Sequence, residues 1–363
     1  MSKMTDEIAK KIFDFKFNNQ DLLKSVDELI GTFNRQRIEI ENCKQINRYA
    51  ANVSVLLLTA NEMERRTLFH YFSNNGIGIV QIPCDNMIYS FFSINEITVA
   101  HVEPETIGSY TKGGTARTLE RALKRIKPTV VISLGVAFGA NYLKHEIGDV
   151  IIGRQFFAYD KATKVEKNSL MIKKLHVLEA DEGLLYKLKA RIQLEQKMTG
   201  RLNNEFQAIL GNMITGEYVV DSERFRRMVF TPFTPFGVVG GEMEAFGIFD
   251  ILRKYGDVHG ILIKGICDWG AGKNEKSEEE EDKSENNYAL PQLDYKNIFQ
   301  VLAMLNVCTV CEEYLINKNF FSDYKIRGFK KWFWRTIGRR KSFKRQEKQS
   351  TGAKLDDKLD SSI

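Results

Sequence analysis

Short apolar runs alternate with amphipathic stretches through most of the chain. The runs are rich in β-branched residues and are bounded by polar or glycine-rich turns, which predicts strands at 53–60, 97–103, 129–139, 149–160, 206–220 and 258–270. Apolar positions at helical spacing predict helices at 61–72, 115–128, 181–196, 241–256 and 297–315. Apolar strands that alternate with helices are typical of a largely parallel sheet with helices on both faces.

Three segments fall outside this alternation. In the first, apolar residues recur at helical spacing from Ile8 to Ile30 among charged positions, which predicts a helical arm over residues 1–50. The second, 275–285, holds seven acids and two lysines and is expected to be a solvated insertion. The third is a basic, aromatic tail at 319–363, whose end we expect to be disordered. Residues 51–318, which include the insertion at 275–285, form the expected main domain.

Composition limits the class of protein. The chain has 363 residues, of which 43% are hydrophobic and 28% charged, so it can bury a full core. No apolar run approaches the ~18 residues of a membrane span, and no apolar segment typical of a secretory signal follows the N-terminal charges. Five scattered cysteines suit a reducing compartment, so we expect a cytoplasmic protein. Cys308 and Cys311 are expected to be two small buried residues on a helix, not a zinc site.

The basic charge belongs to the tail. The formal net charge is +6, but residues 325–363 hold 13 Lys/Arg and 4 Asp/Glu, which leaves the rest of the chain slightly acidic. The net charge therefore says nothing about the substrate of the main domain.

In a parallel sheet covered by helices, the loops after the strands' carboxyl ends build the site. This rule brings four segments to one rim: 61–64, 135–139, 217–221 and 267–270. Three acids stand on or beside it: Glu64, Glu244 and Asp268. Carboxylates there can accept hydrogen bonds from ribose hydroxyls, activate water or donate a proton, although acids at strand ends are also common without any function.

The motifs on this rim resemble those of the nucleoside phosphorylase superfamily. GVAFG, IGDVII, TGEYVVD, GGEMEAFG and KGICDWG occur in the family's order, and the chain looks closest to the 5′-methylthioadenosine/S-adenosylhomocysteine nucleosidase branch. The resemblance covers roughly 53–315. It implies a three-layer α/β fold in which helices flank a central, mostly parallel mixed sheet, with the arm and the tail as additions.

The resemblance also implies roles for individual residues. Asp268 corresponds to the general acid at the purine N7, and Glu64 to the glutamate that orients the attacking water. Glu244 corresponds to the acid that binds the ribose hydroxyls and favours a cationic sugar. The other expected substrate-binding residues are Glu242, Met243, Val219, Tyr218, Val136, Ala137 and Asn61. No metal or other cofactor is implied.

Two motifs decide whether water or phosphate is expected as the nucleophile. The family's early Gly-Asp-Pro-x-Arg phosphate motif is absent, and the Gly-rich turn before the second helix is altered to GSYTKGG. Both departures favour water over phosphate. Phosphorolysis stays open, because Arg65, Arg66, Lys112 and Arg154 could supply a phosphate clamp.

These observations predict an enzyme that hydrolyses the N-glycosidic bond of a purine nucleoside or nucleotide, with adenine favoured. Polar residues at Asn61 and 110–112 suggest a hydroxylated or charged 5′ end, as in AMP or ATP. Some relatives in prokaryotic defence systems degrade nucleotides, so a defence effector is one reading. The alternatives are a phosphorylase and a catalytically silent nucleoside-binding module.

Two further expectations concern partners. The family's subunits share sites across an interface, and the arm's apolar stripe adds surface, so we expect a homodimer or a higher homo-oligomer. Residues 325–348 combine eleven Lys/Arg with aromatic residues, which favours an anionic membrane surface over nucleic acid, with a solvated extension as the alternative. This would place the protein in the cytoplasm with peripheral contact to the membrane.

Overall fold

The computed structural model describes residues 3–36, 38–94, 97–161, 163–166, 169–172, 175–190, 192, 194, 196–271 and 293–315. All of them lie in the first of two compact units, Met1–Ile326, and the second unit, Arg327–Ile363, lies outside the described residues. The expected insertion at 275–285 and the expected tail at 319–363 also lie outside them.

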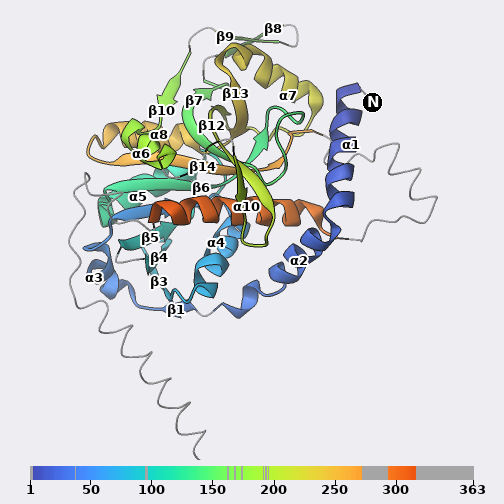
Figure 1. Cartoon of the computed structure of the whole chain (residues 1–363). Helices are drawn as coiled ribbons and strands as arrows, with labels where there is room; N and C mark the ends of the chain where they lie inside the picture. Colours follow the sequence, from blue (N-terminus) through green and yellow to red (C-terminus); the bar gives the residue numbers. More distant parts are fainter. Residues whose placement is uncertain are drawn as a thin grey trace, which may run out of the picture. The chain divides into compact units, whose positions relative to one another are not determined.

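A mixed sheet forms the centre of the first unit (Figure 1). Its path runs β1-β3-β4-β5-β2-β6-β13-β12-β7-β10, while β14 pairs with both β6 and β7, and β11 pairs with β12. The strands are β1 (Ile38–Ile40), β2 (Val55–Leu58), β3 (Ile79–Cys84), β4 (Met87–Ile94), β5 (Ile97–Val102), β6 (Val130–Gly139), β7 (Val150–Ala158), β10 (Val177–Glu179), β11 (Lys197–Thr199), β12 (Glu205–Thr215), β13 (Val238–Glu242) and β14 (His259–Asp268). A separate hairpin joins β8 (Thr163–Glu166) to β9 (Ser169–Ile172).

The strands that lead to the expected rim run parallel. β2 pairs in parallel with β5 and β6, and β6 pairs in parallel with β14. Their carboxyl ends therefore meet at one edge of the sheet, as the sequence predicted. The register of β6 and β14 shifts between Ile266 and Asp268, so the last residue of β14 stands opposite Phe138.

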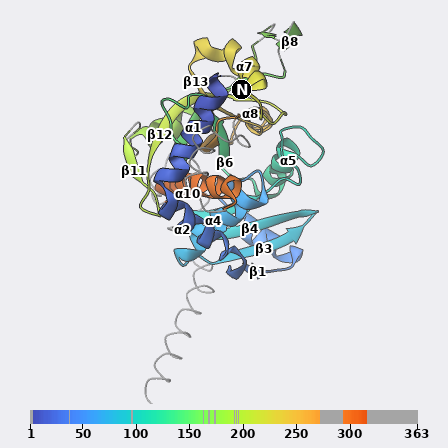
Figure 2. The same ribbon diagram turned by 90° about the vertical axis from the view of Figure 1, so that its right-hand side faces the viewer.

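Helices cover both faces of the sheet, which confirms the predicted three-layer α/β fold (Figures 1 and 2). On one face lie α4 (Glu62–Asn74) and α10 (Tyr295–Leu315), which pack on each other and on β6. On the other lie α5 (Thr115–Ile126), α6 (Glu182–Lys189) and α8 (Ala245–Lys254). The short helix α7 (Glu223–Phe230) follows the loop after β12.

Helix α10 is apolar on all sides because it lies between layers. It packs against β14 on one side and against α4 and α2 on the other. Cys308 and Cys311 are free and fully buried within it, which confirms their prediction as small core residues. Among the described residues, no helix has both the length and the apolar character needed to cross a membrane.

The N-terminal arm packs on its own chain. It contains α1 (Lys3–Asn18), α2 (Gln20–Ile30) and the short α3 (Ile46–Ala50). Half of the apolar stripe expected to offer surface to a partner is buried here, with Ile8 and Val26 fully buried, while Leu22 and Ile30 are partly exposed. The Phe15 and Phe299 rings meet edge to face, with their centroids 5.7 Å apart, which anchors α1 to α10.

Several features differ from the sequence analysis. Residues 38–40 are not helical but form β1, the edge strand beside β3. The hairpin β3–β4 and the strand β13 were not predicted; β13 has only five residues, two of them glycines, so its apolar signal is weak. Cys43 and Cys84 are joined in a disulfide, whereas the scattered cysteines had been read as reduced thiols.

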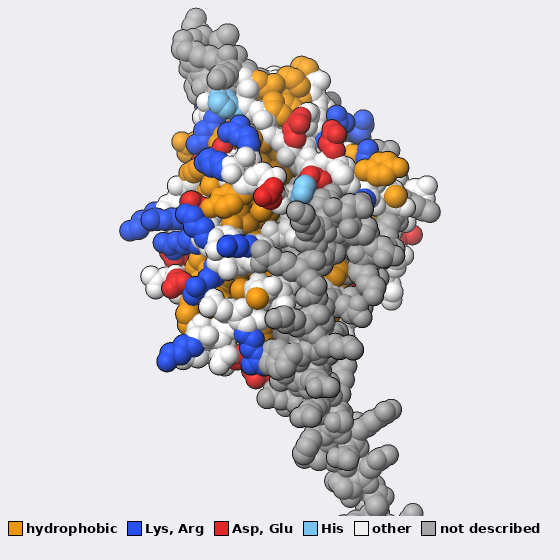
Figure 3. Space-filling view, turned by 90° about the vertical axis from the view of Figure 1, so that its left-hand side faces the viewer, with side chains coloured by type: hydrophobic (Ala, Val, Ile, Leu, Met, Phe, Trp, Pro, Cys, Tyr) orange, Lys and Arg blue, Asp and Glu red, His pale blue; other side chains and the backbone are white. Residues whose placement is uncertain are grey.

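The surface also departs from the slightly acidic average charge of the main domain. Figure 3 shows many Lys and Arg side chains on the side where α5, α6 and α8 lie. Lys124 of α5 and Arg253 of α8 are examples, with side chains that are 65% and 71% exposed. Each pairs with an acid on its own helix, so these are solvated helix faces.

Candidate active site

Glu64 lies in the first turn of α4, directly after β2. Asn61 caps this helix, because its side-chain Oδ1 accepts a hydrogen bond from the Glu64 N–H at 3.0 Å. The Glu64 side chain turns inward and is 2% exposed. Its carboxylate accepts hydrogen bonds from the N–H of Ala60 at 2.6 Å and of Val136 at 3.0 Å. The end of β6 therefore holds the carboxylate that the sequence assigned to the attacking water.

Lys264 brings a positive charge into the same place. It belongs to the buried strand β14 and is completely inaccessible to solvent, and its Nζ donates to Glu244 Oε2 at 2.9 Å. A Cβ at Gly135 would lie 2.6 Å from Glu64 Oε1 and 2.8 Å from Lys264 Nζ. Only glycine at this point of β6 leaves room for both groups. Glu64, Lys264 and Glu244 thus form one buried cluster.

Glu242 holds the backbone at Glu244 through hydrogen bonds. Glu242 ends β13, and its Oε2 accepts hydrogen bonds from the N–H of Glu244 at 2.8 Å and of Ala245 at 2.9 Å. These are N–H groups that the start of α8 would otherwise leave unsatisfied. Glu242 is 3% exposed. Its Oε2 therefore holds the start of α8, and the expected role of Glu242 in substrate binding stays a prediction.

The cluster holds more acid than base, and this changes its protonation. Burial raises the pKa of Glu64 to about 7, and the Lys264 charge opposes this rise. Burial and the neighbouring Glu244 raise the pKa of Glu242 to about 7 as well. For Lys264, burial lowers the pKa, but Glu244, Glu64 and Glu242 outweigh burial and raise it. Lys264 is therefore charged near neutral pH, where Glu64 and Glu242 can each hold a proton.

Asp268 stands at the carboxyl end of β14, four residues after Lys264. Its Oδ1 accepts a hydrogen bond from the Gly270 N–H at 2.7 Å. The ladder sets Asp268 opposite Phe138, and Phe138 opposite Gly241. The strand ends that carry Asp268, Val136 and Glu242 are therefore neighbours. The sequence predicted this for 135–139 and 267–270, but it placed Glu242 in a helix over 241–256, whereas Glu242 ends β13.

Arg226 fixes the loop that follows Asp268. This buried side chain of α7 donates from Nε to the Trp269 carbonyl at 2.7 Å and from Nη2 to the Ala140 carbonyl. It therefore ties the end of β14 to the end of β6. Helix α1 supports α7 through a hydrogen bond from Thr5 to Glu223. Sequence analysis missed Arg226 because nothing local marks an arginine of an amphipathic helix as buried.

The residues expected around the base and sugar divide into two groups. Val136 and Ala137 lie on β6 beside Glu64, and Met243 lies between Glu242 and Glu244. Tyr218 and Val219 lie in the loop after β12 and are 63% and 65% exposed. The neighbouring Val220 is buried instead, in an apolar cluster with Phe138 and Tyr159. The structure therefore brings the sugar-side residues together and leaves the base-side pair open to solvent.

The altered glycine-rich turn at 106–114 belongs to the same site. The Ser109 Oγ donates to the Met243 carbonyl at 2.9 Å and accepts from the Gly247 N–H at 3.0 Å. The Ser109 and Tyr110 N–H groups donate to the carboxylate of Glu217, which follows β12. Sequence analysis placed Glu217 on the rim but gave it no role.

Several cations considered as a phosphate clamp are already paired. Arg65 Nε donates to Glu103 Oε2 at 2.5 Å, and Arg66 pairs with Glu62 at 2.8 Å. Arg154 is exposed on β7. A clamp built from these arginines would first have to break the ion pairs of Arg65 and Arg66.

Lys264 is the main residue that sequence analysis missed. A signal was present, because a lysine within the apolar run of residues 260–267 must find a carboxylate if the run is a buried strand. Glu64 and Glu244 had already been placed at the ends of neighbouring elements. The prediction of one apolar strand over 258–270 gave the charge of Lys264 no role.

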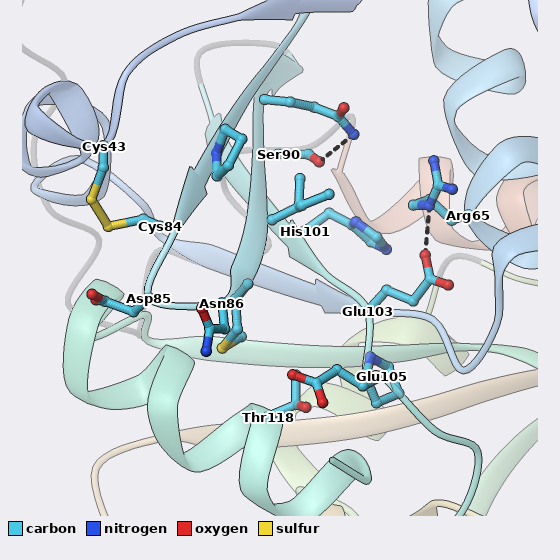
Figure 4. Close-up of a pocket in the computed structure, with 15 residues that line it drawn as sticks. Cys43, Arg65, Cys84, Asp85, Asn86, Ser90, His101, Glu103, Glu105 and Thr118 are labelled. Carbon is cyan, nitrogen blue, oxygen red and sulfur yellow. Dashed lines mark hydrogen bonds and ion pairs between the residues drawn. A yellow bond between two sulfur atoms is a disulfide. The ribbon is translucent and has the colours of Figure 1, made fainter.

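Beside the cluster, a pocket of about 800 Å³ opens between β3, β4, β5 and α5 (Figure 4). Figure 4 shows Arg65 and Glu103 facing each other on one side and the Cys43–Cys84 disulfide on the other. Burial lowers the pKa of His101 in its wall to about 3, so this ring is neutral. Neither Glu64, Glu244 nor Asp268 is among the residues lining this pocket.

Comparison with known proteins bears on this geometry. A family model described as the phosphorylase superfamily matches residues 99–291. No curated protein is significantly similar in sequence to the chain.

Solved structures resemble the fold at low sequence identity. A 5′-methylthioadenosine/S-adenosylhomocysteine nucleosidase from Neisseria meningitidis is 16% identical, with a TM-score of 0.54, over 72% of this chain and 98% of its own. The futalosine hydrolase of Helicobacter pylori is 14% identical, with a TM-score of 0.53, over 72% of this chain and 97% of its own. The methylthioadenosine/S-adenosylhomocysteine nucleosidase of Streptococcus pneumoniae is 16% identical, with a TM-score of 0.53, over 73% and 99%. At these identities the likeness concerns the fold.

Proposed function

The chain belongs to the phosphorylase superfamily, and from this premise we propose that it is a purine N-glycosidase. It hydrolyses the N-glycosidic bond of a nucleoside or nucleotide and releases the free base, with adenine favoured. The observation that carries the proposal is the buried cluster of Glu64, Lys264 and Glu244, with Asp268 four residues after Lys264 at the carboxyl end of β14.

Each group has a chemical task in this reaction. A water oxygen attacks the sugar C1′, the bond from C1′ to the base nitrogen breaks, and the base leaves with the bonding electrons. Glu64 orients the water and takes its proton, for which a pKa near neutrality is well suited. Asp268 donates a proton or a hydrogen bond to the departing base. Glu244 binds the ribose hydroxyls and stabilises the positive charge that develops on the sugar.

Lys264 adds a task that the sequence did not suggest. Its Nζ donates a hydrogen bond to the carboxylate of Glu244, the proposed acceptor of hydrogen bonds from the ribose hydroxyls. It also fixes the carboxylate on one side, which leaves fewer orientations to restrict when substrate binds.

The substrate's 5′ end is less constrained. The Asn61 side-chain oxygen already caps α4, so its amide nitrogen is the group left to meet a 5′ substituent. Tyr110 is 45% exposed at the rim, and its hydroxyl donates to Asp250 at 2.6 Å. These polar groups favour a hydroxylated or phosphorylated 5′ end. A role as a nucleotide-degrading defence effector is the further reading that such a substrate would support.

A substrate panel tests the proposal. The purified full chain is incubated in phosphate-free buffer with adenosine, methylthioadenosine, S-adenosylhomocysteine, AMP and ATP, and with guanine and pyrimidine counterparts. Free base is measured by chromatography. We expect adenine release with free pentose or its phosphate as co-product, and no base release from the whole panel would contradict the proposal.

Asp268→Asn tests the general acid. The variant keeps the size of the side chain but removes its proton, so turnover should fall by roughly two orders of magnitude or more. Asp257→Asn changes an exposed aspartate in the turn before β14 and is the matched control. Full activity in Asp268→Asn would remove Asp268 from the mechanism.

A further inference from the structure

The glycine-rich turn at 106–114 has the shape of an anion-binding nest. Gly108 has φ +110° and Gly113 has φ +83°, conformations that favour glycine. Between them, the consecutive N–H groups of Ser109 and Tyr110 point to the same side and meet one acceptor group. Consecutive backbone N–H groups arranged in this way bind phosphate and other anions in many proteins.

The nest is filled by the protein's own carboxylate. Both oxygens of Glu217 accept from the Ser109 N–H at 3.2 Å, and Oε1 accepts from the Tyr110 N–H at 3.1 Å. A Cβ at Gly108 would lie 2.7 Å from Glu217 Oε2, so glycine is needed for this approach. The Glu217 N–H is held in turn by Asp160 Oδ2 at 2.9 Å.

The nest lies next to the sugar-binding part of the site. Ser109, which supplies one of its N–H groups, also bonds through Oγ to the Met243 carbonyl and the Gly247 N–H. These two groups flank Glu244, the proposed ribose ligand, in the chain. An anion in the nest would therefore lie beside the sugar, where a phosphate nucleophile has to be held.

We propose that Glu217 determines the nucleophile of this enzyme. Its carboxylate occupies the N–H groups that would otherwise hold inorganic phosphate, and its negative charge repels a second anion. Water then attacks C1′ and gives the free pentose. With phosphate in the nest, a phosphate oxygen would attack C1′ instead and give the pentose 1-phosphate and the same base. The inference rests on the proposed N-glycosidase function and assigns its specificity for water.

The first test measures phosphate binding without substrate. Inorganic phosphate is titrated into the full-length wild type, Glu217→Ala and Glu217→Gln by calorimetry, and melting temperatures are recorded with and without phosphate. Removing the charge should strengthen phosphate binding by about tenfold or more, because charge-assisted hydrogen bonds to backbone N–H groups become available. Glu217→Gln keeps the side-chain size and serves if Glu217→Ala does not fold.

Glu105→Ala is the matched control, because it removes a carboxylate from beside Gly113 in the same turn without freeing the two N–H groups. We expect it to behave as the wild type. Three results would overturn the inference: equal phosphate affinity in the wild type and the Glu217 variants, no gain in folded Glu217→Gln, or an equal gain in Glu105→Ala.

A second measurement separates this inference from the proposed function. With a nucleoside that the wild type cleaves, Glu217→Ala should yield pentose 1-phosphate when phosphate is present, and pentose alone when it is absent. If the wild type releases no base but the Glu217 variants gain phosphate binding, the N-glycosidase proposal fails while the assignment of the nest stands. If the wild type itself forms pentose 1-phosphate, Glu217 does not exclude phosphate and the inference is wrong.

Discussion

Burying Lys264 removes a charged ammonium group from water, which is unfavourable unless a partner offsets the loss. Glu244 is that partner, at 2.9 Å, with side-chain exposures of 0% and 6% for the lysine and the glutamate. Hydrophobic residues could fill the same volume without this cost. The ion pair is therefore better explained by the chemistry of the site than by the stability of the strand.

Lys264→Met should lower the free energy of unfolding strongly. The substitution leaves Glu244 buried without its positive partner, and breaking a buried pair in this way costs about 3–5 kcal/mol. Urea denaturation followed by circular dichroism measures the change. Lys254→Met is the control, because its ion pair with Asp250 is exposed and its loss should cost at most about 1 kcal/mol. If both variants lost the same free energy of unfolding, the buried pair of Lys264 and Glu244 would contribute no more than the exposed pair of Lys254 and Asp250.

The raised pKa of Glu64 predicts a pH dependence. The pKa rises to about 7, mainly through burial, and the group must be ionised to accept a proton from water. Activity should therefore increase as pH rises toward about 7 and level off above it. For stability the sign is opposite. The folded state favours the protonated acid, so this contribution is fully present below the ordinary pKa of about 4.5 and is lost as pH rises through about 7.

The measurement is the pH profile of kcat/KM between pH 5 and 9 for the wild type and Glu64→Gln. The amide cannot ionise in this range, so the variant should be slow and should lack the acidic limb. A limb that persists unchanged in Glu64→Gln would assign the titration to another group. A wild-type profile that is flat below pH 7 would mean that ionisation of Glu64 does not limit the rate.

Residues at strand ends were predictable, and contacts between distant residues were not. Glu64 and Asp268 follow apolar runs and Glu244 begins a predicted helix, so the topology rule brought all three to one edge, and the family resemblance supplied their roles. Glu217 and Lys264 act through partners 108 and 20 positions away in the chain, and no local pattern shows such pairings. Tyr218 and Val219 were placed by family resemblance, which does not indicate how exposed they are.

At the scale of elements, α7 holds the loop that directly follows Asp268, the proposed general acid. Arg226→Met would break its hydrogen bonds to the Trp269 and Ala140 carbonyls while keeping much of its apolar contact. We expect kcat to fall by about tenfold or more, because Asp268 would be held less firmly. KM should change less than kcat, and Arg226→Lys should restore part of the rate.

Arg227→Met is the control for this prediction. It lies on the same helix, but its side chain is 58% exposed and pairs with Glu223 one turn earlier. If both variants lower kcat equally, the effect comes from α7 as a whole. If neither does, Arg226 is not a positioning residue for Asp268.

The apolar runs identified most of the central strands and the helices beside them, because period-2 and period-3.6 patterns depend only on burial. They did not identify the hairpin of β3 and β4, although these strands have six and eight residues, nor β1 and β13, which have only three and five. Such short strands are formed by pairing with their neighbours rather than by a pattern of their own. β13 matters for the site, since it ends at Glu242 and delivers Glu244 to α8.

At the scale of the whole molecule, the N-terminal arm changes the argument for self-association. Ile8, Ile12, Leu23 and Val26 of its apolar stripe are buried within the chain, so only the partly exposed remainder, such as Leu22 and Ile30, could meet a partner. A different apolar patch is exposed at the rim of the site. It combines the turn at 106–114 with the loop after β12, and its members are Ile107 (50% exposed), Tyr110 (45%), Tyr218 (63%) and Val219 (65%).

We therefore predict that a second copy of the chain covers this rim patch in a homodimer, since exposed apolar patches commonly mark interfaces. Glu217 links the two loops of the patch through its bonds to Ser109 and Tyr110, so both loops would meet the partner as one surface.

Light scattering at micromolar concentration should give the mass of a dimer for the wild type, and Tyr218→Ser combined with Val219→Ser should shift it toward monomer. Leu143→Ser changes a leucine that is 77% exposed on a different loop and should leave the mass unchanged. A monomeric wild type, or a dimer that only Leu143→Ser weakens, would contradict this interface. Loss of base release together with the dimer in the Tyr218 and Val219 variant would mean that the open base side of the site is completed by the second copy.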